Sequence, residues 1–370
     1  MRLIAVLFAG VMLLSAAAAP AKSVTPRAVV LNDDLKSPWG LAFLPDGRML
    51  VTQKAGSLLL LDATGKRTLA TLAVPPVAFR NQGGLLDVAV DPDYPREPWI
   101  YWTYAEQGSG AEKDLSGTAV ARGRLIGDAL TDIAVIYRQA PKTTGAGHFG
   151  ARIVFRPDKT MYITLGERQK FDPAQDLDGT LGKVIRLNRD GSVPAGNPGV
   201  SKTRPEIWSY GHRNPQGAAL RPGTSELWVN EHGPQGGDEL NRVQPGRNYG
   251  WPKVSYGCPY GAPKGEACRY GGGTHEPAYE PPVSFWVPTS MAPSGLVFYS
   301  GRRFPQWKGD ALMGALAGTA VWRVRLDGNR EAAREALFGD LRERVRDIRE
   351  GPEGYLYLLT DSGKLIQIRD

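Results

Sequence analysis

A short strand, a turn containing Pro, Asp or Gly, and a second short strand recur along this chain and restrict what it can fold into. Apolar and polar residues alternate within each strand, which is typical of a β-strand with one buried face. The first copy is LAFLPDGRMLV, Leu41–Val51, and later copies occupy 88–103, 153–164, 219–229, 295–314 and 348–359. Helical periodicity is nearly absent, and only 329–344 could form one helical turn or so.

Further alternating strands lie between the copies, at Leu58–Asp62, Lys183–Leu187, Val321–Leu326 and Leu365–Ile368. Six units of about four strands each predict an all-β fold, a six-bladed β-propeller. Residues 104–147, 165–183 and 230–290 are long and rich in Gly, Pro and Asn, so we expect functional loops there. In a propeller such loops converge on one mouth of the central channel, and one site could therefore use residues from most of the chain.

Residues 1–21 have the pattern of a signal peptide. Arg2 provides the positive start, Leu3–Leu14 the apolar stretch and Ser15–Ala21 the small residues. The apolar stretch is too short to span a bilayer, and no later segment is apolar enough to insert into a membrane. We therefore expect an exported, soluble protein, periplasmic in a Gram-negative source, with the propeller domain over 22–370.

Two features of composition bear on compartment and partners. Cys258 and Cys268 are the two cysteines, and an oxidising compartment favours a local disulfide, although two free thiols are the alternative. The net charge of +7 is spread along the chain without a Lys/Arg block, which argues against a nucleic-acid partner. A basic surface fits a small anionic ligand or an acidic redox partner equally well.

His148 lies between glycines in TTGAGHFGAR, residues 143–152, directly before a predicted strand. An imidazole in such an open setting could be a general base, because its unperturbed pKa is close to neutral pH. The alternative is a histidine that only forms hydrogen bonds within its loop.

Polar and cationic side chains in three other motifs could contact an anionic ligand. Gln82 lies in NQGGLLD, Arg213 and Asn214 lie in SYGHRNPQG, and Arg344 and Arg346 flank Val345 before the last copy of the repeat. Arginine suits carboxylates, and two arginines one residue apart on a strand share a face. Each motif also has a structural interpretation, namely turn formation, bonding to loop carbonyls, or simple solvation.

The segment NEHGPQGGDELN, residues 230–241, carries Glu231, Asp238 and Glu239 beside glycines and a proline. Hard oxygen ligands of this kind favour calcium, although the spacing is not that of an EF-hand. His232 has no second His or Cys at zinc spacing. The chain has no nucleophile elbow, Walker loop or dinucleotide-binding fingerprint.

Taken together, these motifs resemble the soluble aldose sugar dehydrogenases that depend on pyrroloquinoline quinone (PQQ), which are related to soluble glucose dehydrogenase. The resemblance runs from about Trp39 to the C-terminus, and NQGGLLD, GHFGAR, GHRNPQG, EHGP and RVRD are its most specific parts. It implies an exported quinoprotein, a monomer or homodimer, that oxidises aldoses at the anomeric carbon to lactones and passes electrons to an unidentified acceptor.

The resemblance also assigns roles to residues. His148 is implied to be the general base. The implied cofactor contacts are Gln82, Arg213, Asn214, Tyr260, Leu316, Ala317, Arg344, Val345 and Arg346. The carbonyls of Gly233 and Pro234 are implied to hold the cofactor's Ca²⁺, while Glu239 and the carbonyl of Tyr249 hold a second, structural Ca²⁺.

Two positions depart from the pattern of glucose dehydrogenase. Gly147 replaces an aspartate before the base, and Ala317 replaces a lysine that contacts the quinone; both favour the broader aldose dehydrogenase branch. The alternative function is a non-redox propeller, either a calcium-dependent lactone hydrolase or a ligand-binding module. A hydrolase would require carboxylates around a central metal, and a binding module would have no need of His148.

Overall fold

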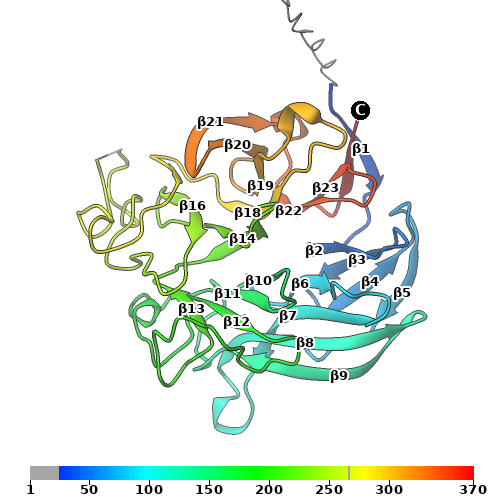
Figure 1. The fold of residues 1–370 in the computed structure, drawn as a ribbon, viewed down its shortest axis with the longest axis horizontal. Coiled ribbons are helices and arrows are strands. Elements are labelled where there is room, and N and C mark those ends of the chain that lie inside the picture. The colour runs from blue at the N-terminus through cyan, green and yellow to red at the C-terminus, as the bar shows by residue number, and fades with distance from the viewer. Residues whose placement is uncertain (1–24, 266) are drawn as a thin grey trace, which may run out of the picture.

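A computed structural model describes residues 25–265 and 267–370, so the expected signal peptide lies outside the described residues. Six four-stranded antiparallel sheets are arranged around a centre (Figure 1), which confirms the predicted all-β, six-bladed propeller. Within the described residues the helical elements are four short 3-10 turns: η1 (Gly110–Glu112), η2 (Asp172–Ala174), η3 (Pro305–Trp307) and η4 (Gly339–Leu341).

Each blade takes its strands in chain order from the centre outward, except the last blade. Blade 1 contains β2 (Pro38–Phe43), β3 (Met49–Gln53), β4 (Ser57–Leu61) and β5 (Thr68–Leu72), and blade 2 contains β6 (Leu85–Val90), β7 (Trp99–Gln107), β8 (Ser116–Ile126) and β9 (Ala129–Arg138). Blade 3 contains β10 (Gly150–Phe155), β11 (Met161–Leu165), β12 (Lys183–Leu187) and β13 (Ile207–Tyr210), and blade 4 contains β14 (Pro215–Leu220), β15 (Leu227–Glu231), β16 (Asp238–Val243) and β17 (Ser284–Trp286). Blade 5 contains β18 (Pro293–Phe298), β19 (Ala311–Ala315), β20 (Val321–Asp327) and β21 (Arg330–Leu337), and blade 6 contains β22 (Val345–Glu350), β23 (Leu356–Thr360), β24 (Leu365–Arg369) and β1 (Arg27–Asn32).

The ring closes through the two ends of the described chain. Strand β1 pairs antiparallel with β24 and becomes the outer strand of blade 6, so the C-terminus lies beside β1 in Figure 1. Each innermost strand contacts the innermost strand of the next blade, and β22 contacts β2. Closure matters because a sheet left open would expose unpaired edges and an unburied face.

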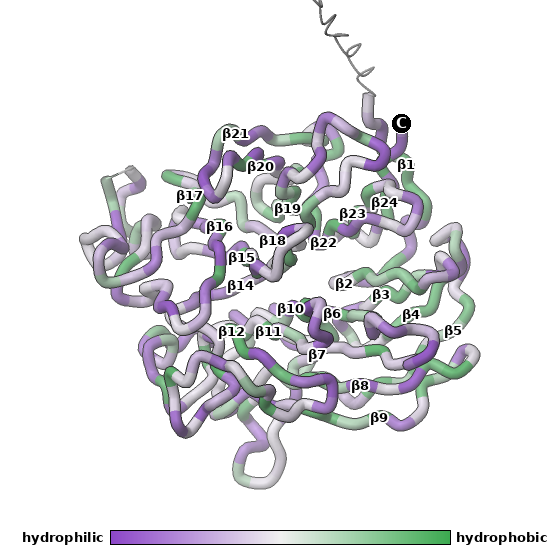
Figure 2. The backbone as a smooth tube through the Cα atoms, viewed as in Figure 1, coloured by the Kyte–Doolittle hydropathy of each residue, from purple (hydrophilic) through white to green (hydrophobic). Residues whose placement is uncertain are grey.

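The hydrophobic core is divided among the interfaces between blades. Strands β3 and β4 are largely hydrophobic (green in Figure 2) because neighbouring sheets cover both of their faces. One cluster of buried side chains fills each interface. Examples are Leu60 with Trp102, Tyr101 with Ile163, Val184 with Val229, Trp228 with Met313, Leu312 with Leu358, and Leu359 with Val51.

All six innermost strands have a register shift close to their first residue, where the sheet leaves regular pairing. An extra residue in one strand of a pair bends that strand and redirects its side chains. These irregular ends lie at one mouth of the channel, and the loops that precede them carry five of the sequence-predicted site residues, Gln82, His148, Arg213, Asn214 and Arg344.

Two expectations from the sequence are wrong in part. Residues 330–337 form the outer strand β21, and only Gly339–Leu341 makes a helical turn. Pairing with β20 overrides the helix propensity of the Ala, Arg and Glu residues there. The expected loop 104–147 contains the end of β7 and the long strands β8 and β9, which extend blade 2 outward.

Within residues 25–265 and 267–370, no helix is both long and apolar enough to cross a bilayer.

Candidate functional site

The mouth of the channel contains a cavity of about 270 Å³ to which every blade contributes. Four of the expected site residues line it: Gln82, Leu316, Arg344 and Arg346. The other lining residues are Trp39, Lys54, Asn81, Leu86, Phe149, Gly150, Gln216, His232 and Ala292. Residues up to about 300 positions apart in the sequence therefore meet in one pocket.

His148 is buried beside this cavity, with 5 % of its surface exposed. Its backbone N–H donates to the Gln82 side-chain oxygen Oε1 (2.8 Å), and its φ of 50° is left-handed. The ring nitrogen Nδ1 lies 2.5 Å from Oε1 of Glu167. His148 is thus fixed at both its backbone and its ring, next to the cavity-lining residues Phe149 and Gly150.

Glu167 is a site residue that the sequence analysis missed. It is fully buried just beyond the end of β11, and its second oxygen accepts the backbone N–H groups of Lys170 and Phe171 (2.5 and 2.9 Å). The sequence did offer one signal, because Glu167 follows a glycine and lies two residues after a strand. Nothing in the local sequence, however, connects this carboxylate to a histidine 19 positions earlier.

The Glu167 contact decides which nitrogen of His148 is free. An imidazole whose Nδ1–H donates to a carboxylate keeps its lone pair on Nε2. Burial lowers the pKa of His148, the Glu167 hydrogen bond opposes that shift, and the positive charge of Arg213 adds to it. The ring is therefore neutral near pH 7 and can accept a proton.

Arg213 and Asn214 lie on the loop before β14. Arg213 lines a second and much smaller cavity, which also borders His232. The Arg213 guanidinium donates to the carbonyl of His232 and to the Tyr260 hydroxyl (both 3.1 Å). Nε of Arg213 and Nδ2 of Asn214 are buried without a hydrogen-bond partner in the described part of the chain. Such donors fit a polar ligand, since an unpaired buried donor is costly.

Positive charge gathers where blades 6 and 1 meet. Arg344 and Arg346 both bind the Asp361 carboxylate through Nε (each 2.9 Å), and Lys54 lines the same cavity. Burial alone would raise the pKa of Asp361, but the two arginines outweigh it and hold that pKa below its usual value. Lys54 is a second site residue that the sequence analysis missed.

Besides Arg213 and Asn214, three more of the expected cofactor residues do not line the main cavity. Val345 packs into the interface between blades 5 and 6, Ala317 is exposed beside Leu316, and Tyr260 is 70 % exposed. A side chain between two arginines on a strand points to the opposite face, so Val345 could contact a ligand only through its backbone.

Two buried carboxylates face each other at the smaller cavity. Glu231 and Glu239 are directly opposed on β15 and β16, and Nδ2 of Asn241 donates to both of them (each 3.1 Å). Burial, and next the negative charge of Glu231, raise the pKa of Glu239 well above its usual value. Like charges placed this way are unfavourable without a cation.

The expected calcium residues are distributed unevenly around that cavity. Gly233, Glu239 and Tyr249 line it, whereas Pro234 does not. No group of three His, Cys, Asp or Glu side chains gathers as a metal site within the described ranges. A cation held here would therefore depend on backbone carbonyl oxygens, which suits calcium.

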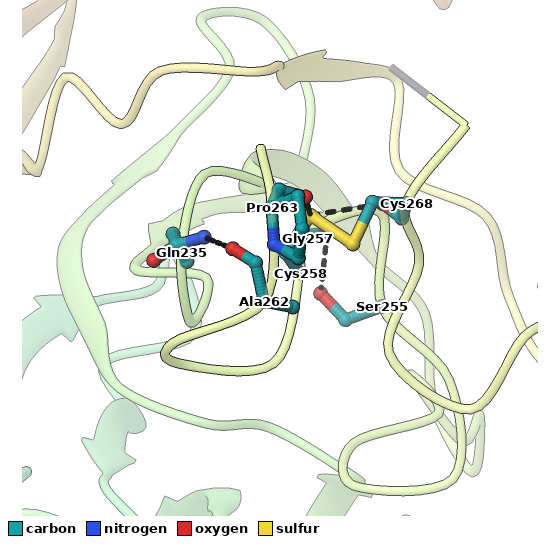
Figure 3. Close-up of a disulfide and its surroundings, with 7 residues drawn as sticks. All are labelled: Gln235, Ser255, Gly257, Cys258, Ala262, Pro263 and Cys268. Atoms are coloured by element: carbon teal, nitrogen blue, oxygen red, sulfur yellow. Dashed lines mark hydrogen bonds between the residues drawn. A yellow bond between two sulfur atoms is a disulfide. The ribbon is translucent and has the colours of Figure 1, made fainter. Parts of the chain in front are cut away.

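The predicted disulfide between Cys258 and Cys268 is confirmed (Figure 3). It closes a loop that contains Tyr260, the residue that contacts Arg213. The backbones of Cys258 and Gln235 exchange two hydrogen bonds (3.0 and 3.1 Å), which attach this loop to the segment that carries Gly233 and Pro234.

A buried ionic network connects the inner strands of several blades. Arg152 contacts Asp87 and Asp347 (3.0 and 3.1 Å), and Arg349 contacts the same two carboxylates (2.9 and 3.0 Å). The Arg152 guanidinium also lies 4.1 Å from the ring centre of the cavity-lining Trp39. The network joins the cavity wall to the channel and restricts movement of the blades that carry the site.

The chain matches a family model described as Glucose / Sorbosone dehydrogenase over residues 35–367. It is 43 % identical over 359 residues to the aldose sugar dehydrogenase YliI of Escherichia coli (strain K12), covering 95 % of this chain and 94 % of that protein.

Solved structures agree with this match. The apo-form crystal structure of the soluble aldose sugar dehydrogenase from Escherichia coli has a TM-score of 0.85 at 42 % identity, over 93 % of this chain and 99 % of that one. The PQQ-bound form of aldose sugar dehydrogenase from Streptomyces coelicolor has a TM-score of 0.75 at 30 % identity, over 93 % of this chain and 98 % of that one.

Proposed function

Because the chain belongs to the glucose/sorbosone dehydrogenase family, we propose that it is a PQQ-dependent aldose sugar dehydrogenase that oxidises the anomeric carbon to a lactone. The relatives named above support this reaction, and one of them was solved with PQQ bound. The observation that carries the proposal is the buried His148–Glu167 pair beside a cavity that also holds three cationic side chains.

The donors around the cavity fit a flat polycarboxylate cofactor. Arg344 and Arg346 would bind its carboxylates from one side, and the buried, unpaired donors of Arg213 and Asn214 would bind its polar atoms from the other. Gln82, which already orients His148, would lie at the same edge. When bound, PQQ supplies the two-electron oxidant, and an external acceptor must then remove the electrons.

Calcium fits the paired acidic groups near the cofactor position. The carbonyls of Gly233 and Pro234 would hold the ion next to PQQ, while Glu239 and the carbonyl of Tyr249 would hold a structural ion. The support for the second site is the opposed pair Glu231 and Glu239, whose repulsion a divalent cation would relieve.

His148 would carry the proton transfer. Its Nε2 accepts the proton of the sugar's anomeric hydroxyl, because Nδ1 is bonded to Glu167 and the ring is neutral. Removing this proton makes the anomeric carbon a better hydride donor. Glu167 then stabilises the imidazolium and keeps the ring in place.

We also propose export to an oxidising compartment such as the periplasm. The signal-peptide pattern of residues 1–21 and the Cys258–Cys268 disulfide support it.

The proposal is tested by reconstitution. Purified apo-protein given PQQ and Ca²⁺ is expected to reduce a dye in the presence of aldoses, and to lose that activity after exhaustive chelation. His148→Ala is expected to lower turnover by about 10²–10⁴-fold while PQQ still binds. Lactone hydrolysis without dye reduction would instead support the calcium-dependent hydrolase, and PQQ binding without either activity would leave a ligand-binding module.

A further inference from the structure

We propose that Lys54 is a cofactor-binding residue whose ammonium group contacts a carboxylate of the polycarboxylate cofactor. The inference rests on the proposed function, but it concerns a residue outside all the motifs that suggested that function. It is argued from the position of Lys54, from its partners and from the charges around it.

The backbone of Lys54 is held firmly at the mouth of the channel. Lys54 lies in the turn between β3 and β4, where its N–H donates to the carbonyl of Ser37 (3.1 Å) and its carbonyl accepts the N–H of Leu85 (2.9 Å). A Cβ on Gly84 would lie 2.2 Å from the carbonyl oxygen of Lys54, so only a glycine lets these two backbone segments approach so closely. A side chain that starts from this point projects from a fixed base into the cavity wall.

The ammonium group lacks an anionic partner. It donates to the backbone carbonyl of Asn81 and lies 5.8 Å from the ring centre of Phe79. No carboxylate within the described ranges lies at ion-pair distance from it, whereas Arg344 and Arg346 share Asp361. A lysine ammonium has three N–H donors, so donors remain for a ligand.

The surrounding charge favours an anion at this position. Lys54, Arg344 and Arg346 line one cavity, and Asp361 is the carboxylate that pairs with the two arginines. Burial first, and the positive charge of Arg346 second, lower the pKa of Lys54, and the negative charge of Asp361 opposes this shift only in part. A carboxylate placed among these three cations would relieve the repulsion between Lys54 and Arg346.

The arrangement also matches a ligand with several carboxylates. Lys54 belongs to blade 1 and the two arginines to blade 6, whose inner strands β2 and β22 are in contact. The cations therefore approach the cavity from two adjacent blades, and one rigid ligand could meet both groups through separate carboxylates. Lys54 would then decide the orientation of the cofactor in addition to its affinity.

The test uses calorimetry to measure the equilibrium binding of PQQ to the apo-protein at a fixed Ca²⁺ concentration. Lys54→Met keeps most of the side-chain volume and is expected to weaken binding about 10- to 100-fold, the usual effect of losing a charge-assisted hydrogen bond. Lys54→Arg keeps the charge and is expected to bind within a few-fold of the natural protein. Lys66→Met, at an exposed lysine of the same blade, is the matched control and should have no effect.

Two comparisons make the outcome decisive. The trimethyl ester of PQQ lacks the carboxylate charges, so the natural protein and Lys54→Met should bind it equally. If the loss persists with the ester, or if Lys54→Met binds PQQ as well as the natural protein does, the inference is overturned while the proposed function survives. If the natural protein does not bind PQQ at all, the proposed function itself fails.

Discussion

The two ring nitrogens of His148 have different surroundings, and this difference determines what the residue can do. Nδ1 is bonded to the buried Glu167, while Nε2 has no hydrogen-bond partner among residues 25–265 and 267–370. Glu167 does not line the cavity, so it is a positioning residue that acts through His148. Its own second oxygen is held by two backbone N–H groups, which keeps the pair rigid.

Glu167→Gln should lower turnover and move the acid limb of the pH profile. The hydrogen bond and the negative charge of Glu167 both raise the pKa of His148 against the effect of burial. A glutamine oxygen can still accept the Nδ1–H but carries no charge, so that pKa falls further. The base then stays neutral to lower pH, and the acid limb of kcat/KM shifts to lower pH. An unchanged limb would contradict the coupling of the two residues. Glu112→Gln, at an exposed turn, is the control.

At the scale of elements, the segment between β16 and β17 supports the site from outside the blades. It carries Tyr249 and the disulfide loop, and Tyr260 within that loop contacts Arg213. The long connection in blade 4 therefore completes a site that the blades begin.

Replacing both Cys258 and Cys268 with serine should weaken PQQ binding several-fold and speed up proteolysis near 255–270. The bridge joins two residues ten positions apart and restricts the conformations that the loop between them can adopt. Release of the loop frees Tyr260 from Arg213, while the blades stay intact. Limited proteolysis and PQQ titration measure both effects. A large drop in thermal stability with normal PQQ affinity would contradict a local role.

At the scale of the whole molecule, the ring is held together by closure at its ends and by charges at its centre. Pairing of β1 with β24 joins the two ends of the described chain. The network of Asp87, Arg152, Asp347 and Arg349 links blades 2, 3 and 6 across the channel. A site assembled from six blades depends on both the end-to-end pairing and the central network. A small rotation of one blade would displace the cavity-lining residues that this blade contributes.

Asp87→Asn should destabilise the fold by about 3–5 kcal/mol. Asp87 is fully buried, and without its charge Arg152 and Arg349 each lose one of the two carboxylates that they contact. Urea denaturation measures the change. Asp34→Asn removes an exposed ion pair with Lys36 and should leave the midpoint unchanged. Equal midpoints for the two variants would show that the central network contributes nothing to stability.

Local pattern was sufficient for most of the fold, and it failed where a strand depended on distant partners. The six repeats predicted the blades because alternation reports one buried face per strand. Residues 330–337 have helical propensity yet form a strand, since the edge of β20 was available for pairing. The strands β8 and β9 were missed for a similar reason, because their regularity comes from pairing with each other and with β7.

The sequence by itself determined the strand repeat, the motifs that carry His148, Arg213 and the two final arginines, and hence the family. Only the tertiary structure decided that Glu167 orients His148, that Lys54 joins the arginines, and that Glu231 opposes Glu239. The physical reason is the separation along the sequence of the residues that interact. A repeat or motif is a property of neighbouring residues, whereas hydrogen bonds and charge interactions among blades exist only after closure of the ring brings remote strand ends together.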